Sequence, residues 1–160
     1  MIGYLNLLKP SFNFENPYKT DDYNVLLWGF QPETKMSGFR KSFTVNAGTG
    51  IEVLAYDFKK DSYALLPNNK FVGTDMVLVF TQNGEPADAY ILILFGDVDG
   101  DGKIGTSDLL ALKKEILGIK YLNGAYWLAA KVSGKSGYVG AADLLALKKH
   151  ILGITSISQK

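Results

Sequence analysis

Hydrophobic residues change their spacing near residue 96. Over residues 20–96 they gather in short runs that are rich in Val, Ile, Leu, Phe and Tyr and are separated by turn-forming residues. Runs of this kind at intervals of roughly 8 to 12 residues are typical of β-strands in a small sandwich or open barrel. Residues 1–19 fit either an extra strand at Tyr4–Leu8 or a linker. The predicted strands are Tyr23–Trp28, Phe39–Val45, Ile51–Phe58, Ser62–Leu66, Thr74–Thr81 and Asp88–Phe95.

The last two predicted strands are joined through Asn83-Gly84. Both residue types tolerate the positive φ angles that a two-residue hairpin turn requires. We therefore expect these two strands to be antiparallel neighbours in the sheet.

After residue 96 the apolar spacing becomes helical, and one segment is duplicated. The sequence Asp-Leu-Leu-Ala-Leu-Lys-Lys-Glu-Ile-Leu-Gly at residues 108–118 recurs at residues 143–153, an offset of 35 residues, with His150 in place of Glu115. The duplication implies two similar helical units related by a pseudo-two-fold axis. Between them, Leu122–Lys131 predicts a third helix. Three of its residues are expected to fill the space between the duplicated helices, namely Tyr126, Trp127 and Ala130.

The segment Asp97-Val-Asp-Gly-Asp-Gly-Lys-Ile-Gly-Thr-Ser-Asp108 leads into the first duplicated helix and matches the twelve-residue calcium loop. Acidic residues occupy loop positions 1, 3, 5 and 12, and a glycine at position 6 permits the sharp turn. A hard divalent cation binds six to eight oxygens at about 2.3–2.6 Å, so the loop predicts one Ca2+ site. The apolar run Ala89–Phe95 reaches the loop directly, so we expect no entering helix of the calmodulin type. The predicted ligands are Asp97, Asp99, Asp101, Lys103 through its backbone carbonyl, and Asp108.

The corresponding segment before the second helix departs from this pattern. Aligned from Lys131, it is one residue too long, and Lys131, Ser133 and Lys135 replace the three loop aspartates. Because two cations facing one carboxylate disfavour a divalent ion, we expect no calcium in loop 131–143. Either a lysine ammonium paired with Asp143 closes this loop, or packing of Val139 and Tyr138 does so.

Composition narrows the chemistry. Lys and Arg total 17 and Asp and Glu total 16, and this near-neutral balance argues against nucleic-acid binding. The chain has no cysteine and a single histidine, His150, so any metal must be held by oxygen. No apolar run approaches the roughly 20 residues of a membrane span, and we expect no membrane insertion. Because Met1–Pro10 lacks the features of a signal peptide, the chain is expected to be either intracellular or a piece of a longer secreted protein.

The β region offers little catalytic chemistry. Asn46–Gly50 contains glycine but lacks the Lys-Ser/Thr pair and following helix of a phosphate-binding loop. No convergent set of acids, bases and nucleophiles is recognisable, so we expect no enzyme. Trp28, Tyr56 and Tyr63 leave open a sugar-stacking platform, although aromatic residues on strands more often belong to the core.

The first duplicated helix carries two apolar stripes. Leu109, Leu112 and Ile116 are spaced to share one helix face, which we expect in the core. A second stripe of Leu110, Lys114 and Leu117 is rotated by about 100°. A small two-helix core has little room for both. The second stripe is therefore either a contact surface with a basic margin or an extension of the core.

The calcium loop with Asp at position 12, the following Leu-Leu-x-Leu-Lys-Lys-x-Ile-Leu-Gly and their duplication after 35 residues resemble the dockerin module. The likeness covers Gly96 to about Ile154. It implies calcium-dependent binding of a cohesin module. Residues 20–96 resemble the immunoglobulin-like X module that often precedes a dockerin, through Phe71-Val-Gly-Thr-Asp-Met and through Asp88-Ala-Tyr-Ile-Leu-Ile-Leu-Phe-Gly96.

The resemblance also indicates which residues meet cohesin. Loop positions 10 and 11 and the outer helix face carry this role in dockerins. In copy one they are Thr106, Ser107, Leu110, Lys113, Lys114 and Leu117, and in copy two Ala141, Ala142, Leu145, Lys148, Lys149 and Leu152. The near-identity of the helices permits two binding orientations, and the hydroxyls of Thr106 and Ser107 are expected to favour one of them.

Taken together, these features predict an α+β chain of two modules: an N-terminal segment or extra strand at 1–19, an Ig-like β-sandwich at 20–96, and a three-helix dockerin with duplicated F-hand repeats at 97–160. We expect a non-catalytic docking unit that assembles or anchors a secreted, cellulosome-type complex for polysaccharide degradation, outside the cell or at its surface. The alternatives are a carbohydrate-binding module with a calcium-stabilised tail and a calcium-responsive peptide-binding switch.

Overall fold

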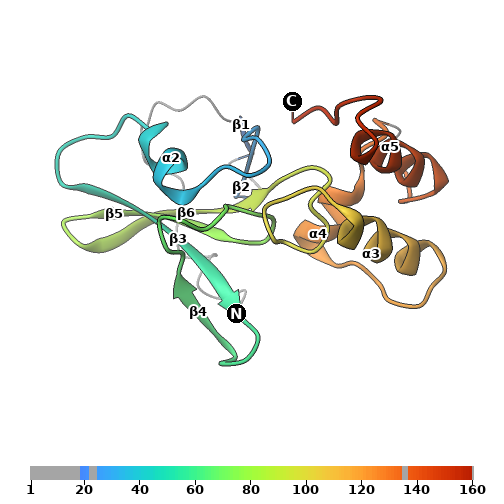
Figure 1. Ribbon diagram of the computed structural model, residues 1–160. Coiled ribbons are helices and arrows are strands. Elements are labelled where there is room, and N and C mark those ends of the chain that lie inside the picture. Colours follow the sequence, from blue (N-terminus) through green and yellow to red (C-terminus); the bar gives the residue numbers. More distant parts are fainter. Residues whose placement is uncertain (1–18, 22–24, 135–136, 160) are drawn as a thin grey trace.

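The computed structural model describes residues 19–21, 25–134 and 137–159 of the chain (Figure 1). Below, the β unit means the described residues up to Phe95, and the helical unit means the described residues from Gly96 to Gln159. The suggested strand at Tyr4–Leu8 lies outside the described residues. In chain order the elements are β1 (Lys19–Asp21), β2 (Leu26–Trp28), α2 (Met36–Lys41), β3 (Thr49–Asp57), β4 (Ser62–Leu65), β5 (Val77–Gln82), β6 (Glu85–Ile93), α3 (Thr106–Ile116), α4 (Gly124–Ala130) and α5 (Ala141–Ile151).

The six described strands form one mixed sheet in the order β1-β2-β6-β5-β3-β4. Only β2 and β6 pair in parallel among these strands. Helix α2 lies over one face of the sheet (Figure 1). There Met36 and Phe39 of α2 join Leu78 and Phe80 of β5 in the main hydrophobic core. The expected β-rich character is confirmed, but these strands form one sheet rather than the two facing sheets of a sandwich.

The predicted hairpin at Asn83-Gly84 is confirmed. Gln82 pairs with Glu85, so two residues form the turn between β5 and β6. Their φ angles are 53° and 88°, in the left-handed region that a right-handed hairpin twist requires.

The predicted strand at Phe39–Val45 is wrong, because its first residues belong to helix α2. Met36 and Phe39 are three residues apart, and both are fully buried against the sheet. In a helix this spacing places both side chains on one face. The aromatic residues Phe39 and Phe43 then meet edge to face at 5.1 Å, which continues the core beyond the end of the helix.

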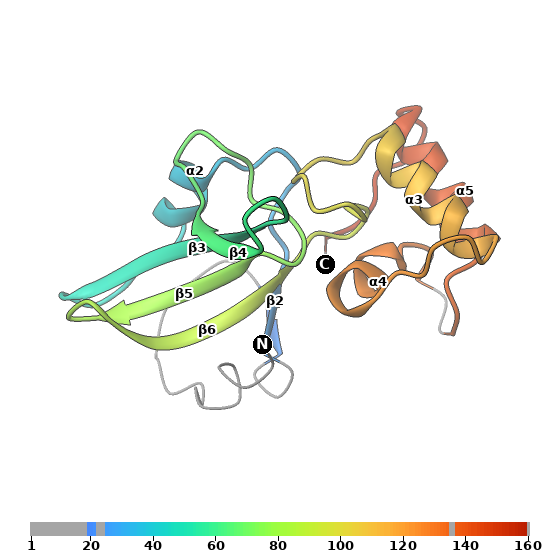
Figure 2. The same ribbon diagram turned by 90° about the horizontal axis from the view of Figure 1, so that it is seen from below.

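In the helical unit, α3 and α5 lie side by side (Figure 2). Leu112 of α3 and Leu147 of α5 occupy the same position in the repeat, and both are fully buried in one cluster. The third helix is confirmed as α4, and its Ala130 joins this cluster as expected. Tyr126 is placed differently from the prediction: its hydroxyl hydrogen-bonds to Asp75 of the β unit.

The two units share an apolar junction. Ile93 of β6 packs with Ala125 and Ala129 of α4, and the Gly96 amide donates to the Ala129 carbonyl at 2.8 Å. The side-chain amide of Gln159 both donates to the Phe95 carbonyl, at 2.7 Å, and accepts from the Phe95 N–H, at 2.9 Å. The end of the described chain therefore closes back on the residue that leads from the sheet into the loop. No described helix is long and apolar enough to cross a lipid bilayer.

Candidate metal centre

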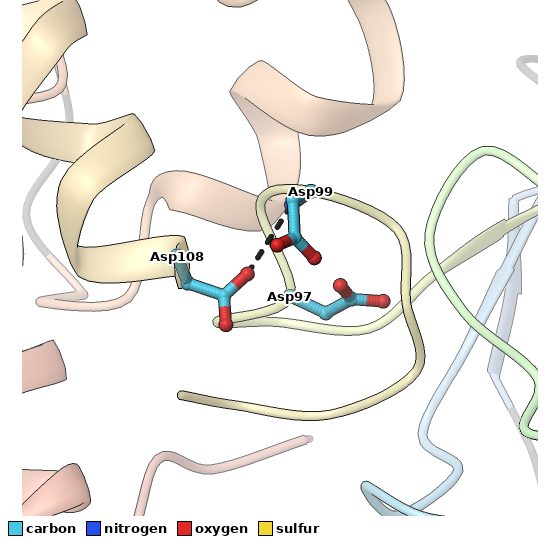
Figure 3. Close-up of side chains that lie close together, drawn as sticks. All are labelled: Asp97, Asp99 and Asp108. Atoms are coloured by element: carbon cyan, nitrogen blue, oxygen red, sulfur yellow. Dashed lines mark hydrogen bonds between the residues drawn. The ribbon is translucent and has the colours of Figure 1, made fainter. Parts of the chain in front are cut away.

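Three of the four predicted acidic ligands come together in the loop between β6 and α3. Carboxylate oxygens of Asp97, Asp99 and Asp108 lie within 4.8 Å of one another (Figure 3). Asp97 and Asp108 are fully buried, whereas Asp99 is exposed. The fourth, Asp101, is exposed and accepts a hydrogen bond from the Lys103 N–H at 2.8 Å. No entering helix precedes the loop, as predicted, because β6 leads into it.

Backbone amides bind both oxygens of Asp97. Oδ1 accepts from the Gly100 N–H at 2.8 Å and the Asp101 N–H at 3.1 Å. Oδ2 accepts from the Gly102 N–H at 3.1 Å and from Thr74 of the β unit at 2.8 Å. The turn that brings these amides inward needs φ near 80° at Gly100 and at Gly102, which glycine adopts without strain.

Asp108 joins the loop to helix α3. Its Oδ2 accepts from the Gly105 N–H at 2.7 Å, directly before the helix begins. Its Oδ1 accepts from the Val98 N–H at 2.7 Å, at the start of the loop. One carboxylate therefore closes the loop and satisfies an amide at the helix N-terminus, where negative charge is favourable.

Burial raises the pKa of Asp97 to about 7, and repulsion from Asp108 acts in the same direction against the amide hydrogen bonds. Burial also raises the pKa of Asp108 to about 6, with further repulsion from Asp99. A cation beside these carboxylates relieves both effects, because it stabilises the ionised forms. The donor set consists of oxygen atoms alone, which fits a hard divalent cation such as Ca2+.

These shifts predict how the stability of the protein depends on pH. Because the pKa values of Asp97 and Asp108 lie above their ordinary 3.8, the folded metal-free chain binds more protons than the unfolded chain between about pH 4 and 7. Its stability therefore falls as the pH rises through that range. Calcium binds the ionised carboxylates, so the rise in melting temperature that calcium causes is expected to be larger at about pH 8 than at about pH 5.5. Scanning calorimetry measures the rise in melting temperature at both pH values. An equal rise at the two would contradict the assignment of Asp97 and Asp108 as calcium ligands.

The second loop is closed by the same kind of hydrogen bonds. Asp143 Oδ1 accepts from the Ser133 N–H at 2.9 Å, and Oδ2 accepts from the Gly140 N–H at 3.0 Å. These donors lie 35 residues after Val98 and Gly105, so the repeat offset holds through the loop.

The sequence alignment of this loop is therefore wrong by one residue. The second loop begins at Val132, not at Lys131, and has the same length as the first. Its first position holds an apolar side chain that packs against the helical core. Lys131 does not pair with Asp143, because its ammonium lies 4.4 Å from the centroid of the Trp127 ring. Of the two residues proposed to close the loop by packing, Val139 reaches the core, whereas Tyr138 is exposed. Lys135 lies outside the described residues.

Removal of the Asp143 carboxylate is expected to lower the stability of the protein without changing its calcium binding. Asp143→Ala leaves the Ser133 and Gly140 amides without this acceptor at a site where Asp143 is 4% exposed. An unsatisfied buried group costs about 1–3 kcal/mol, so we expect the free energy of unfolding to fall by about 2–3 kcal/mol. Denaturant unfolding measures this loss, and calorimetry is expected to find calcium uptake unchanged. Loss of a calcium ion in this variant would overturn the assignment of loop 132–143 as metal-free.

Glu115 and His150, the differing pair within the duplicated segment, serve the same structural role. Glu115 Oε2 accepts from the Leu122 N–H at 2.6 Å, and His150 Nδ1 accepts from the Ile157 N–H at 3.1 Å. Each acceptor holds the chain seven residues further along, where Leu122 and Ile157 pack against the same core. The substitution therefore changes the chemical group but keeps the contact.

The leucines on the outer faces of α3 and α5 are exposed to similar extents in the two copies. Leu110 and Leu145 are 54% and 53% exposed, and Leu117 and Leu152 are 71% and 62% exposed. Leu112 lies in the core as predicted, whereas Ile116, also expected there, is exposed. Two further hydrophobic residues, Ile119 and Ile154, follow the two helices and are also exposed. The duplicated Leu-Gly-Ile at 117–119 and 152–154 is the sequence signal that points to them.

The other residues predicted to meet cohesin are also accessible. Lys114 and Ala142 are half-buried. The exposed members are Thr106, Ser107, Lys113, Ala141, Lys148 and Lys149.

The three aromatic residues considered for sugar binding do not form one platform. Tyr56 of β3 and Tyr63 of β4 meet edge to face at 5.2 Å at one side of the sheet. Trp28 lies on β2, near the opposite edge, and packs in the junction cluster with Ile93. These three residues therefore do not form a flat surface of aromatic rings.

Comparison with known proteins identifies the C-terminal part of the chain. Residues 95–152 match the family model described as the dockerin type I domain. No curated protein and no solved structure was found to match the chain. The matched segment contains the acidic loop, all three helices of the helical unit, the first copy of the repeat and the second copy up to Leu152. Residues 95–152 therefore belong to the dockerin type I family.

Proposed function

We propose that the chain is a non-catalytic docking unit that binds one calcium ion and, with it, a cohesin module. The cluster of Asp97, Asp99 and Asp108 carries this proposal, because two of its three carboxylates are buried close together and neither forms an ion pair with a described residue. Asp101 and the backbone carbonyl of Lys103 are the further ligands that the loop pattern assigns. Calcium supplies the positive charge that lets these oxygens converge.

The loop is linked directly to the docking helix. Asp108 holds Gly105 and Val98 together, and α3 begins at Thr106. An ordered loop therefore fixes where Thr106 and Ser107 stand and how the first turn of α3 is directed. Because the ion binds the folded loop, binding energy becomes folding energy of the helical unit.

The docking surface that we propose is the exposed outer face of α3 and α5. Its apolar centre is flanked by lysines in the last turns of both helices, which suits a partner with an apolar patch and an acidic margin. Its members are Thr106, Ser107, Leu110, Lys113, Lys114 and Leu117 in copy one, and Ala141, Ala142, Leu145, Lys148, Lys149 and Leu152 in copy two. The similar exposure of the leucine pairs Leu110/Leu145 and Leu117/Leu152 supports binding in two orientations, with the hydroxyls of copy one favouring one.

In this proposal, residues 20–96 form an X-like β module that precedes a dockerin at 97–160. The complete assembly is a secreted or cell-surface complex of the cellulosome type that degrades polysaccharides. The two alternatives lose support: the three aromatic residues do not form a sugar platform, and the calcium loop has no entering helix whose movement could open a peptide groove.

Calorimetric titration of the full chain with a panel of cohesin modules tests this function. We expect at least one cohesin to bind in calcium, and the same titration after calcium removal to show a large loss of affinity. Binding that is undiminished without calcium, or polysaccharide binding in place of cohesin binding, would contradict the proposal.

A further inference from the structure

The calcium loop packs directly against the β unit. The contact is made by the segment Phe71–Thr74, which precedes β5, and by Glu33, which precedes α2. Both regions lie far from the loop in the sequence. The loop pattern by itself contains no sign of this contact, because the pattern covers residues 97–108 alone.

Two backbone amides of the β unit donate hydrogen bonds to the loop. The Thr74 N–H donates to Asp97 Oδ2 at 2.8 Å, and the Glu33 N–H donates to the Gly102 carbonyl at 2.8 Å. The first bond holds the side chain at loop position 1, and the second holds the glycine at position 6. Thr74 is itself fixed, since its hydroxyl and Leu94 bond to each other at 3.1 Å in both directions.

The two backbones touch without space for side chains. A Cβ atom added to Gly73 would lie 2.6 Å from the Gly100 carbonyl oxygen, 2.7 Å from the Gly102 nitrogen and 2.8 Å from Asp97 Oδ2. A Cβ atom added to Gly102 would lie 2.6 Å from the Phe71 Cβ. The absence of a side chain at Gly73 therefore allows the β unit to pack closely against the loop.

Helix α4 contacts the same region through Tyr126. The Tyr126 hydroxyl hydrogen-bonds to Asp75, which directly follows Thr74. The Tyr126 ring also lies close to Gly100, because a Cβ atom added to that glycine would be 3.1 Å from a ring carbon. The loop thus contacts both a turn of the β unit and a helix of the helical unit.

We propose that the β unit forms the second half of the calcium site: Gly73, Thr74 and Glu33 position Asp97 and the turn at Gly102 for the ion. This inference rests on the calcium binding proposed above. These residues position ligands and do not bind the metal themselves. Coupling of this kind is reciprocal, so calcium also fixes the β unit against the docking helices.

A matched pair of glycine substitutions tests the coupling. Gly73→Ala inserts a methyl group against Asp97 and the loop backbone, whereas Gly38→Ala places one in α2 with no atom within 4 Å. We expect Gly73→Ala to weaken calcium binding by roughly tenfold or more in a calorimetric titration, because the loop must shift away from the ion-binding geometry. Gly38→Ala is expected to bind calcium as tightly as the unmodified chain.

Amide hydrogen exchange of the unmodified chain provides a second test that does not depend on a variant folding. Calcium is expected to slow exchange of the Glu33 and Thr74 amides. The Asn83 amide, which bonds to the Gly48 carbonyl at 2.9 Å away from the loop, is the control and is expected to change less.

The outcomes distinguish failure of the coupling from failure of the proposed function. Equal calcium affinity in Gly73→Ala and the unmodified chain, or unchanged exchange of the Glu33 and Thr74 amides on calcium addition, overturns the coupling and leaves the proposed function intact. Absence of calcium uptake by the unmodified chain overturns both. An equal loss of thermal stability in Gly73→Ala with and without calcium would assign Gly73 a purely structural role, which also overturns the coupling.

Discussion

We expect Asp97→Asn to abolish calcium uptake and to lower cohesin affinity by roughly 100-fold or more. The carboxylate of Asp97 is fully buried, its oxygens accept four backbone hydrogen bonds, and it stands at the first ligand position of the loop. Asparagine has the same shape but no negative charge, so it removes the attraction for the ion. Removal of one partner of a buried charge pair costs about 2–5 kcal/mol, and each 1.4 kcal/mol is tenfold in affinity. Calorimetry against calcium, and then against cohesin in calcium, measures both losses.

Asp143→Asn is the matched control for this substitution. It makes the same chemical change at a position where a carboxylate likewise closes a loop through backbone amides. We expect its calcium stoichiometry to equal that of the unmodified chain. Circular dichroism establishes that both variants keep their helices. Full calcium uptake by folded Asp97→Asn would show that the ion binds elsewhere.

We expect the double variant with Leu110→Asp and Leu145→Asp to lose roughly 100-fold or more in cohesin affinity, and either single variant to lose less. Each leucine is about half exposed and central to its helix face, so a charge there must be desolvated when the partner covers it. A change that removes one of two equivalent orientations only halves the association constant. Because Thr106 and Ser107 add hydroxyl groups to copy one, we expect a larger loss from Leu110→Asp than from Leu145→Asp. Titration of the three variants with one cohesin compares them directly.

Phe58→Asp provides the control for an exposed hydrophobic residue outside this surface. Phe58 is 81% exposed and follows β3 in the β unit. Its replacement is expected to leave cohesin affinity unchanged. Equal, small losses from Leu110→Asp and Leu145→Asp would support two equivalent orientations, and unchanged binding by the double variant would remove these faces from the interface.

Local patterns predicted the parts of the fold whose interactions are local. The Asn83-Gly84 turn, the acidic loop and the duplicated helices each depend on neighbouring residues or on a fixed helical spacing, and the structure contains all three. Helix α2 was missed because its apolar residues continue into Phe43, which makes the segment resemble a strand. Its helical form depends on packing of Met36 and Phe39 against a sheet whose strands lie both before and after α2 in the sequence.

The sequence predicted the acidic residues within loop 97–108 but not the contacts between this loop and the β unit. Thr74 and Glu33 donate hydrogen bonds to the loop, and Gly73 packs closely against it. These contacts join residues that are distant in the sequence, so no repeat or spacing predicts them. The register of the second loop was misjudged for a different reason. The alignment began at the charged residue Lys131. The 35-residue offset of the helices, however, already places Val132 at the first loop position.

The number of calcium ions bound per chain tests the central claim most directly. Native mass spectrometry, together with calorimetric titration at millimolar calcium, counts them in the unmodified full chain. We predict one ion, lost on Asp97→Asn and kept on Asp143→Asn. Two tightly bound ions would contradict the assignment of loop 132–143, and no bound ion would contradict the calcium site on which the proposed docking function depends.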